Sequence, residues 1–177
     1  MASFSLLPDA QSGTNQWAAS TGTDFVDIVD EDDDSTYIYE TRSGQEINYT
    51  FANPTAAQVA SIDFDEDVTV SIFVNAHHTG TGTATLDLDT QGVGITLATV
   101  TVAVANDDSF PSYAGSSTTI KSFGNHWDAG GLNALSLEVK CQTNTARFQY
   151  LRVSYIYIKL AYTAVVTDNA VFFGANF

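Results

Sequence analysis

The sequence lacks several features that would assign it to a class at once. It holds one cysteine in 177 residues, Cys141, so no intrachain disulfide can form. No apolar run approaches the roughly 20 residues that a membrane-spanning helix requires. Its start, MASFSLLP, has no basic residue and too short an apolar patch for a secretory signal. We therefore expect a disulfide-free protein that is made in a cytosol and has no membrane partner.

Basic residues are also scarce. Six lysines and arginines stand against 21 aspartates and glutamates, for a net charge of −15. Residues 1–89 hold 16 of the acids and one base, Arg42, whereas residues 90–177 hold five of each. Such a chain repels phosphate groups, which argues against a nucleic-acid partner. The skew indicates either that the second half faces a neighbouring protein and the first half water, or only that surface acids keep the protein soluble.

Catalytic motifs are missing as well. The sequence has no Gly-x-Ser-x-Gly element, phosphate-binding loop or dinucleotide fingerprint, so we expect no catalytic residue, no cofactor and no enzyme. His77 and His78 are adjacent on an expected strand, where their side chains point to opposite faces and cannot chelate one ion. His126 is the third histidine, and no cysteine or carboxylate stands at ligand spacing, so zinc is not expected.

The acidic run at residues 30–34 raises the question of calcium. Asp30, Asp32 and Asp34 match the first, third and fifth places of a helix–loop–helix calcium loop. The pattern then fails, because Ser35 stands where that loop needs glycine and Thr41 where it needs a bidentate glutamate. A solvated acidic turn is one interpretation, and a looser calcium site is the other.

The sequence is rich in short runs that alternate between apolar and polar residues and are separated by turn residues. The clearest spans Val68–Ala76, with apolar residues at every second place. Only residues 54–60 predict a helix, with Pro54 near its start. About nine strands with hairpin-length connections predict an all-β fold, an antiparallel two-sheet β-sandwich of the jelly-roll type. The expected strands cover residues 24–29, 36–40, 45–51, 68–76, 83–89, 95–104, 117–123, 132–141 and 149–163.

Two expected strands contain a break in their pattern. In residues 95–104 the apolar phase slips between Leu97 and Val100, which predicts a bulge or a turn. In the last strand the odd-numbered residues 151–157 and the even-numbered residues 156–162 are mostly apolar or aromatic. Either another subunit covers one face of this strand, or a kink exchanges its faces midway.

The sandwich is expected over residues 1–163, and an apolar tail over residues 164–177. The tail is too apolar for a free terminus, because burying its three phenylalanines is worth roughly 5–8 kcal/mol. It therefore docks on its own domain or on a neighbouring chain. The residues expected at an assembly interface are Tyr155, Tyr157, Val171, Phe172, Phe173 and Phe177.

Aromatic residues outside the strand cores leave two readings open. Trp17 follows a Gly-containing polar segment, and Trp127 lies in a glycine-rich loop. Either tryptophan can plug an end of the sandwich as a core or rim anchor. Alternatively, exposed tryptophans and tyrosines can form the flat platform on which a carbohydrate-binding β-sandwich holds a sugar.

Four segments carry a family resemblance. They are an early Trp17, Ile28-Val-Asp-Glu31 with an acidic cluster leading to Ser35-Thr-Tyr-Ile38, Leu132-Asn-Ala-Leu135, and Arg152-Val-Ser154 before a closing strand. Over residues 15–163 the chain resembles jelly-roll structural proteins of tailed bacteriophages, including capsid decoration or cement proteins. The resemblance implies that Trp17 and Tyr37 are core or rim anchors and that the last strand is central. It does not extend to the tail.

This resemblance implies a virion structural protein. A decoration protein of this kind binds the outer surface of the head and stabilises it. We accordingly expect a homo-oligomer, a trimer in the simplest case, bound to the major capsid protein on the capsid exterior after synthesis in the host cytoplasm. The alternative is a carbohydrate- or receptor-binding β-sandwich module associated with a tail or fibre.

Overall fold

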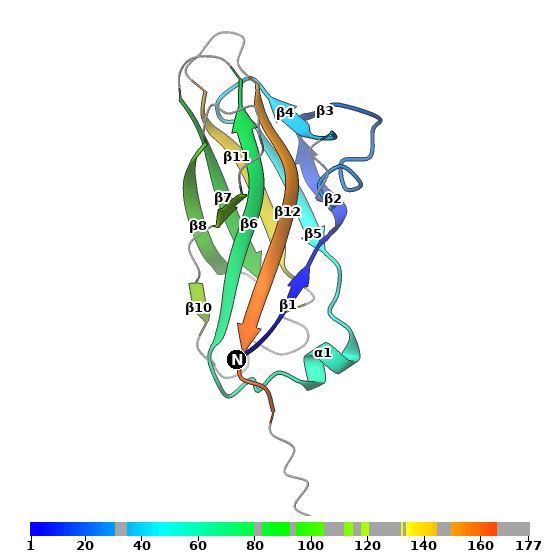
Figure 1. The fold of residues 1–177 in the computed structure, drawn as a ribbon, viewed down its shortest axis with the longest axis vertical. Coiled ribbons are helices and arrows are strands. Elements are labelled where there is room, and N and C mark those ends of the chain that lie inside the picture. Colours follow the sequence, from blue (N-terminus) through cyan, green and yellow to red (C-terminus); the bar gives the residue numbers. More distant parts are fainter. Residues whose placement is uncertain are drawn as a thin grey trace, which may run out of the picture.

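The computed structural model describes residues 1–30, 35–79, 83–92, 95–104, 112–114, 118–120, 132, 134–144 and 150–165. Its strands form two sheets that pack face to face (Figure 1). Every strand pairing within these ranges is antiparallel. None of the helices in them is long and apolar enough to cross a membrane. The predicted antiparallel two-sheet sandwich is therefore confirmed.

The described residues place seven strands in one sheet and five in the other. The first sheet contains β1 (Ala2–Leu6), β3 (Ala18–Ala19), β4 (Ile38–Glu40), β6 (Val68–His78), β9 (Ser112–Ala114), β10 (Thr118–Ile120) and β12 (Leu151–Tyr162). The second contains β2 (Pro8–Asn15), β5 (Glu46–Phe51), β7 (Ala84–Gly92), β8 (Ile95–Val104) and β11 (Ser136–Asn144).

The strand order is that of a jelly roll. The seven-stranded sheet runs β10-β6-β12-β4-β3, with β1 beside β12 and β9 beside β6, and the five-stranded sheet runs β2-β5-β11-β7-β8. From β4 onward, the chain crosses between the sheets at nearly every step, so β4-β12-β6-β10 lies opposite β5-β11-β7-β8. Two interlocked Greek keys of this kind define the jelly-roll sandwich.

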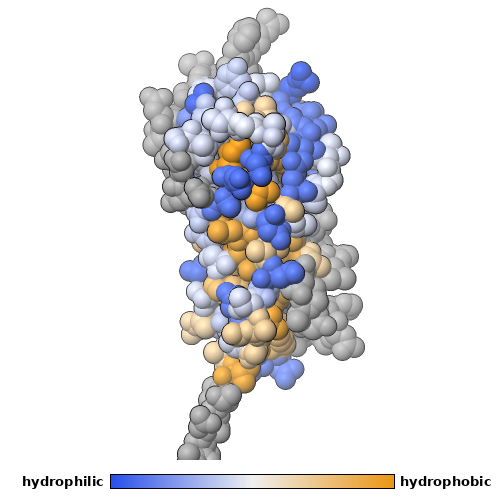
Figure 2. Space-filling model, turned by 90° about the vertical axis from the view of Figure 1, so that its right-hand side faces the viewer, coloured by the Kyte–Doolittle hydropathy of each residue, from blue (hydrophilic) through white to orange (hydrophobic). Residues whose placement is uncertain are grey.

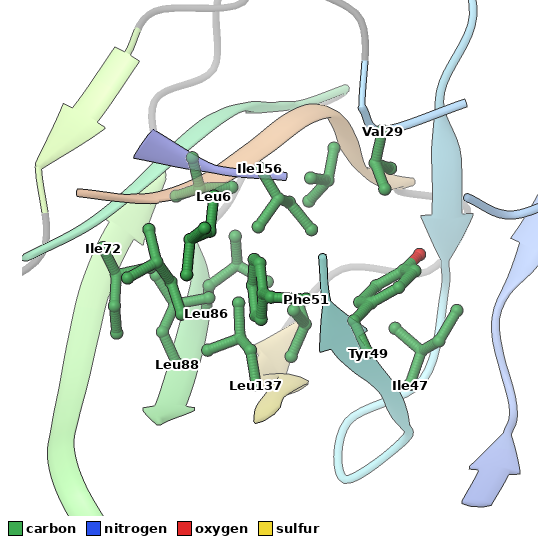
Figure 3. Packing of buried hydrophobic residues seen from close by; sticks show 14 of the residues in the cluster. Leu6, Val29, Ile47, Tyr49, Phe51, Ile72, Leu86, Leu88, Leu137 and Ile156 are labelled. Carbon is green, nitrogen blue, oxygen red and sulfur yellow. The ribbon is translucent and has the colours of Figure 1, made fainter. Parts of the chain in front are cut away.

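The core lies between the sheets and is built by alternate residues of the long strands (Figure 3). In β6, Val68, Val70, Ile72 and Val74 are all buried, and the residues between them are half-buried on the outer face. Each such aliphatic side chain stabilises the fold by about 1.5–3 kcal/mol. Cys141 of β11 is also buried in this core.

β12 contains a kink. Its pairing with β6 shifts by one residue between Val153 and Tyr155, which makes a β-bulge at Ser154. Because of the extra residue, Val153 and Ile156 both point to the buried side of the sheet. In a regular strand, residues three positions apart would point to opposite sides. The kink expected as one explanation of this two-faced apolar strand is therefore present.

Residues 24–29 form turns, so the strand predicted there is wrong. The Asp24 carboxylate accepts hydrogen bonds from the backbone amides of Val26 (3.1 Å) and Asp27 (3.4 Å). Short polar side chains compete for backbone groups in this way and favour turns over strands. The turns place the Val29 carbonyl 2.9 Å from the Ile156 amide, which donates to it just beyond the bulge.

The turn segment and β1 lie along one side of the sandwich, at the seam between the sheets. Figure 2 shows that hydrophobic atoms surface along the middle of this side between hydrophilic ones. Phe4, Phe25 and Val26 are partly buried and pack against the core. Leu7, by contrast, is 36% exposed.

The phase slip predicted between Leu97 and Val100 corresponds to a bulge. Thr90 of β7 pairs with Ala98 of β8, and Gln91 pairs with Thr96, so Leu97 is skipped. The slip therefore falls at the first residue of the expected interval. β1 and β2, at the N-terminus, were not predicted.

The predicted short helix is α1 (Ala56–Ala60). The Thr55 hydroxyl accepts a hydrogen bond from the Gln58 amide (3.2 Å), and the Gln58 side chain accepts one from the Thr55 amide (2.7 Å). This capping box starts the helix just after Pro54.

The first residues of the predicted tail lie against their own domain. Ala164 forms an isolated bridge with Ile62, and the Val165 amide donates to the Ser61 carbonyl over 3.0 Å. The rest of the tail, including Val171, Phe172, Phe173 and Phe177, lies outside the described residues.

Candidate functional site

The outer face of the seven-stranded sheet holds a hollow of about 230 Å³ near the start of β12. We call it the tyrosine hollow. It is lined by Ser20, Tyr37, Tyr39, Tyr150 and Arg152. Of these, the sequence singled out only Tyr37, as a core or rim anchor, and the structure places it at this surface.

Strand alternation points these side chains outward. Ile38 and Leu151 are fully buried, so the residues on either side of each point away from the core. β4 pairs with β12 such that Tyr39 stands directly opposite Arg152. Directly opposite residues on one face of a sheet have Cβ atoms about 4.5–5.5 Å apart, so their side chains meet.

Tyr39 lies at the centre of the aromatic cluster. Its ring meets that of Tyr37 edge to face, with 6.2 Å between centroids and 63° between planes. It meets Tyr150 in the same way at 5.2 Å and 81°. Each edge-to-face pair contributes about 0.5–1.5 kcal/mol beyond its buried area, so the three rings hold one another in place.

Arg152 joins the rings as a cation. Its guanidinium carbon lies 4.6 Å from the centroid of Tyr37 and 5.9 Å from that of Tyr150. Both distances fall within the roughly 6 Å over which a cation is attracted to an aromatic face. The Nε of Arg152 is buried and has no hydrogen-bond partner among the described residues.

Reciprocal hydrogen bonds fix the backbone at both ends of the hollow. The Tyr37 amide donates to the Ser20 hydroxyl (2.9 Å), and the Ser20 amide donates to the Tyr37 carbonyl (2.8 Å). The Tyr150 amide donates to the Thr79 hydroxyl (3.2 Å), and the Thr79 amide donates to the Tyr150 carbonyl (3.0 Å). The site is thus preformed, although Tyr150 is 40% exposed to solvent.

A second hollow of about 200 Å³ shares Tyr39 as a wall. Its other lining residues are Gln16, Ala18, Glu40, Thr41 and Arg42. The Glu40 carboxylate accepts hydrogen bonds from the backbone amides of Thr41 (2.7 Å) and Arg42 (2.9 Å). This carboxylate is therefore engaged by the backbone, whereas the Arg42 residue is exposed.

Tyr155 and Tyr157, expected at an assembly interface, form a separate group on the same face of the sheet. The Tyr157 ring stacks on that of Phe73, with 4.6 Å between centroids and 4° between planes. Tyr155 lies 5.2 Å from Tyr157 at a tilt of 41°. We call Phe73, Tyr155 and Tyr157 the aromatic row; all three are half-buried.

The two tryptophans do not form a surface platform in the described structure. Trp17 is 4% exposed and belongs to the core, and its indole Nε1 donates to the Gln45 carbonyl over 3.2 Å. Trp127 lies outside the described residues. Of the tryptophans and tyrosines expected as candidates for a sugar platform, it is tyrosines that line the hollow.

The calcium candidate is only partly within the described structure. Asp30 is described, and Asp32 and Asp34 are not. Burial raises the pKa of Asp30, and the charges of Asp27 and Asp24 raise it further. No group of three histidine, cysteine, aspartate or glutamate side chains that could hold a metal ion occurs among the described residues.

The adjacent histidines lie on β6, opposite the start of β12. His77 pairs with Arg152 and His78 with Leu151. Both are almost fully buried, at 3% and 2% exposure, and successive positions of a strand point to opposite faces. His126 is not among the described residues.

Four acidic residues converge on the outer face of the five-stranded sheet. Cross-strand pairing brings Glu46, Asp87 and Asp89 together with Glu138 and Lys140 on the five-stranded sheet. Burial, and then the charge of Glu46, raises the pKa of Glu138, while Lys140 lowers it. β11, from the second half of the chain, thus lies in the middle of this acidic surface.

A signal for the tyrosine hollow was present in the sequence but incomplete. Tyr-Ile-Tyr at 37–39 and Tyr-Leu-Arg at 150–152 each place a buried aliphatic residue between two outward ones. The alternation could have indicated which side chains reach the surface. It could not indicate that β4 pairs with β12, so the convergence of the two triplets was missed.

No family model matches the chain, and no curated protein matches it. Among solved structures, it is similar to the CBM36-1 domain of a multidomain xylanase from the hindgut metagenome of Trinervitermes trinervoides, with 13% identity and a TM-score of 0.43 over 93% of this chain and 100% of that one. A carbohydrate-binding module CBM36 in complex with calcium and xylotriose shares 14% identity, with a TM-score of 0.38 over 91% and 100%. The CBM22-1 xylan-binding domain of Paenibacillus barcinonensis Xyn10C shares 17%, with a TM-score of 0.39 over 91% and 95%.

Proposed function

We propose that the protein is a carbohydrate-binding module and that the tyrosine hollow is its binding site. The observation that carries the proposal is the convergence of three tyrosines and one arginine on one preformed hollow of a sheet surface. A sugar ring has apolar C–H faces and a polar rim of hydroxyls. Tyrosine matches both, because it presents a flat apolar ring and a hydroxyl.

The parts of the hollow have distinct roles in this proposal. Tyr150, the most exposed ring, is the platform on which a sugar stacks. Tyr39 and Tyr37 form the wall, and Ser20 and Arg152 supply polar groups at the edge. A site that is largely aromatic with a few placed polar groups is the usual design of a small-ligand pocket.

The neighbouring hollow extends the site. With Tyr39 as their common wall, the two hollows together fall within the roughly 300–1,000 Å³ typical of ligand sites. This favours an oligosaccharide over a single sugar. None of the described residues that line the tyrosine hollow is a carboxylate, so the acid pair used in glycoside hydrolysis is not supplied there. The proposal is therefore binding without cleavage.

A glycan array followed by calorimetry on the retained glycans tests this function. Replacing Tyr150 with alanine should weaken binding about tenfold, which corresponds to about 1.4 kcal/mol. The matched control is Tyr155→Ala, on the same sheet face in the adjoining strand β12 but outside the hollow, which should leave the affinity within about twofold. An array without any retained glycan, or equal losses in both variants, would contradict the proposal.

A second candidate function, assembly into a larger particle, is favoured by the aromatic row. Stacked aromatic side chains on an outer sheet face suit a subunit contact, since aromatics are enriched at interfaces. In this form the protein would be the expected homotrimer on a capsid exterior, in contact with the major capsid protein. Light scattering of the wild type and of a Tyr155→Ser/Tyr157→Ser double variant tests it: the wild type should be oligomeric and the variant monomeric. A wild type that is monomeric at every concentration would exclude it.

A further inference from the structure

We infer that the saccharide bound in the tyrosine hollow is anionic and that its carboxylate or sulfate group pairs with Arg152. The inference rests on the proposed function and names the class of its ligand. The inference is drawn from the chemistry of Arg152. Stacking of a sugar on tyrosine rings does not by itself account for an arginine in the hollow.

Arg152 is a cation in a chain that has few. The protein holds six basic residues against 21 acidic ones. Arg152 is the one charged side chain among the described residues that line the hollow, and its Nε is buried without a hydrogen-bond partner in the described structure. Because the Nε is enclosed, a ligand meets Arg152 through the part of its side chain that lines the hollow.

The contacts of Arg152 prepare it for an anion. The Tyr37 and Tyr150 rings, 4.6 and 5.9 Å from its guanidinium carbon, attract the cation through their faces. A guanidinium fixed in this way keeps its planar N–H groups in one orientation, and their fork matches the two oxygens of a carboxylate or sulfate. The partly buried setting also strengthens the ion pair relative to bulk water.

The adjoining hollow fits the same ligand class. Arg42 lines it, across Tyr39 from Arg152, so a chain with repeated acidic groups meets a second cation. The carboxylate of Glu40, which also lines that hollow, accepts hydrogen bonds from two backbone amides. None of its described contacts is with the side chain of Arg42. Because the net charge of −15 repels anions at long range, recognition depends on these local arginines.

Calorimetry with four saccharides tests the inference on the full chain. The probes are tetragalacturonate, its fully methyl-esterified form, a sulfated galactan tetrasaccharide and neutral xylotetraose. Methyl esterification removes the charge and keeps the sugar ring, so the first pair isolates the carboxylate. The sulfated probe separates the two sources of negative charge. We expect one of the two anionic probes to bind at least tenfold more tightly than the neutral ones.

The protein variants are Arg152→Gln, Arg152→Lys and Lys159→Gln. Loss of a charge-assisted hydrogen bond predicts that Arg152→Gln weakens binding of the anionic probe about 10- to 100-fold. Arg152→Lys, which keeps the charge but not the fork, should recover part of this loss. Lys159→Gln removes one positive charge from the same strand at an exposed position outside the hollow, and should change the affinity less than twofold. Thermal melts of each variant confirm that it is folded.

The outcomes separate the inference from the proposed function. The inference would be overturned if the neutral probes bound as tightly as the anionic ones and Arg152→Gln left the affinity unchanged. The carbohydrate-binding function would then still stand. Equal losses in Arg152→Gln and Lys159→Gln would also overturn it, since only net charge would then matter. No binding to any probe and no glycan retained on the array would overturn both.

Discussion

Tyr49 donates its hydroxyl hydrogen to the carbonyl oxygen of Phe25 over 3.3 Å, although its side chain is fully buried. Burial raises the pKa of Tyr49 far above its usual value, so the hydroxyl stays protonated and remains a donor. The bond ties the turn segment at residues 24–30 to the five-stranded sheet. The Ile156–Val29 bond ties the same segment to the seven-stranded sheet, so this loop cross-links the two layers.

Replacing Tyr49 with phenylalanine should lower the free energy of unfolding by about 0.5–1.5 kcal/mol, because the Phe25 carbonyl loses its partner while the packing is kept. Urea unfolding measures the change. Tyr150→Phe removes a hydroxyl from a surface ring and should shift stability by less than about 0.5 kcal/mol. Similar effects in both variants would show that the Tyr49 bond is not structural.

Deleting Ser154 should prevent folding. Without the bulge, either the residues before it or those after it must turn their apolar side chains to solvent, because one residue reverses the face of a strand. Loss of the near-ultraviolet circular dichroism signal and of soluble yield would report this. Deletion of Glu66, in an exposed turn before β6, is the control and should leave a folded protein. A folded Ser154 deletion with native stability would contradict the role of the bulge.

Glu138→Gln should stabilise the protein at neutral pH. Because the pKa of Glu138 is raised in the folded state, by burial and by Glu46, the native protein binds this proton more tightly than the unfolded chain does. Stability contributed by this group is therefore lost as pH rises from the unfolded value of 4.5 through the raised folded one. The gain from Glu138→Gln should be present at pH 7 and shrink toward pH 4 in urea titrations.

Lys140→Gln provides the opposite test. The charge of Lys140 lowers the pKa of Glu138, so its removal should destabilise the protein at pH 7.

For Glu138→Gln itself, a gain in stability that grows toward low pH would contradict the raised pKa of Glu138.

Cys141 should be inert toward thiol reagents in the native protein. It is buried in β11, and burial, followed by the charge of Glu40, raises its pKa to about 12. The reactive thiolate is accordingly rare at pH 8. Ellman's reagent should label one thiol per chain in urea, and native protein only at the rate of unfolding. Rapid native labelling would show that the thiol is accessible.

The sequence was informative where side-chain periodicity is local. Alternation predicted β6 and the other long strands, and a phase slip predicted the bulge at Leu97. The Thr55–Gln58 capping box accounts for the helix predicted at Pro54. The turns at residues 24–29 were mistaken for a strand, because Val26, Ile28 and Val29 are apolar and the competing Asp24 cap has no periodic signature.

The candidate site was harder to predict because it depends on pairing between distant strands. Tyr39 and Arg152 are far apart in the sequence and meet only because β4 and β12 are neighbours. The tryptophans drew attention as the larger aromatics, yet Trp17 fills the core, since its indole finds a partner in the Gln45 carbonyl. Tyr155 and Tyr157 were noticed as part of a two-faced strand, but not their stacking with Phe73.

β1 lies beside the last residues of β12, with Ala2 opposite Tyr162, whereas Arg152 lies ten positions earlier on the same strand (Figure 1). At about 3.3 Å per residue, the tyrosine hollow is roughly 33 Å from the pole at which Ala2 and Tyr162 lie. A support attached at this pole would therefore be separated from the hollow by most of the length of β12. On a sensor chip or a larger particle, the domain would bind a long polymer across its sheet face, at a distance from the support.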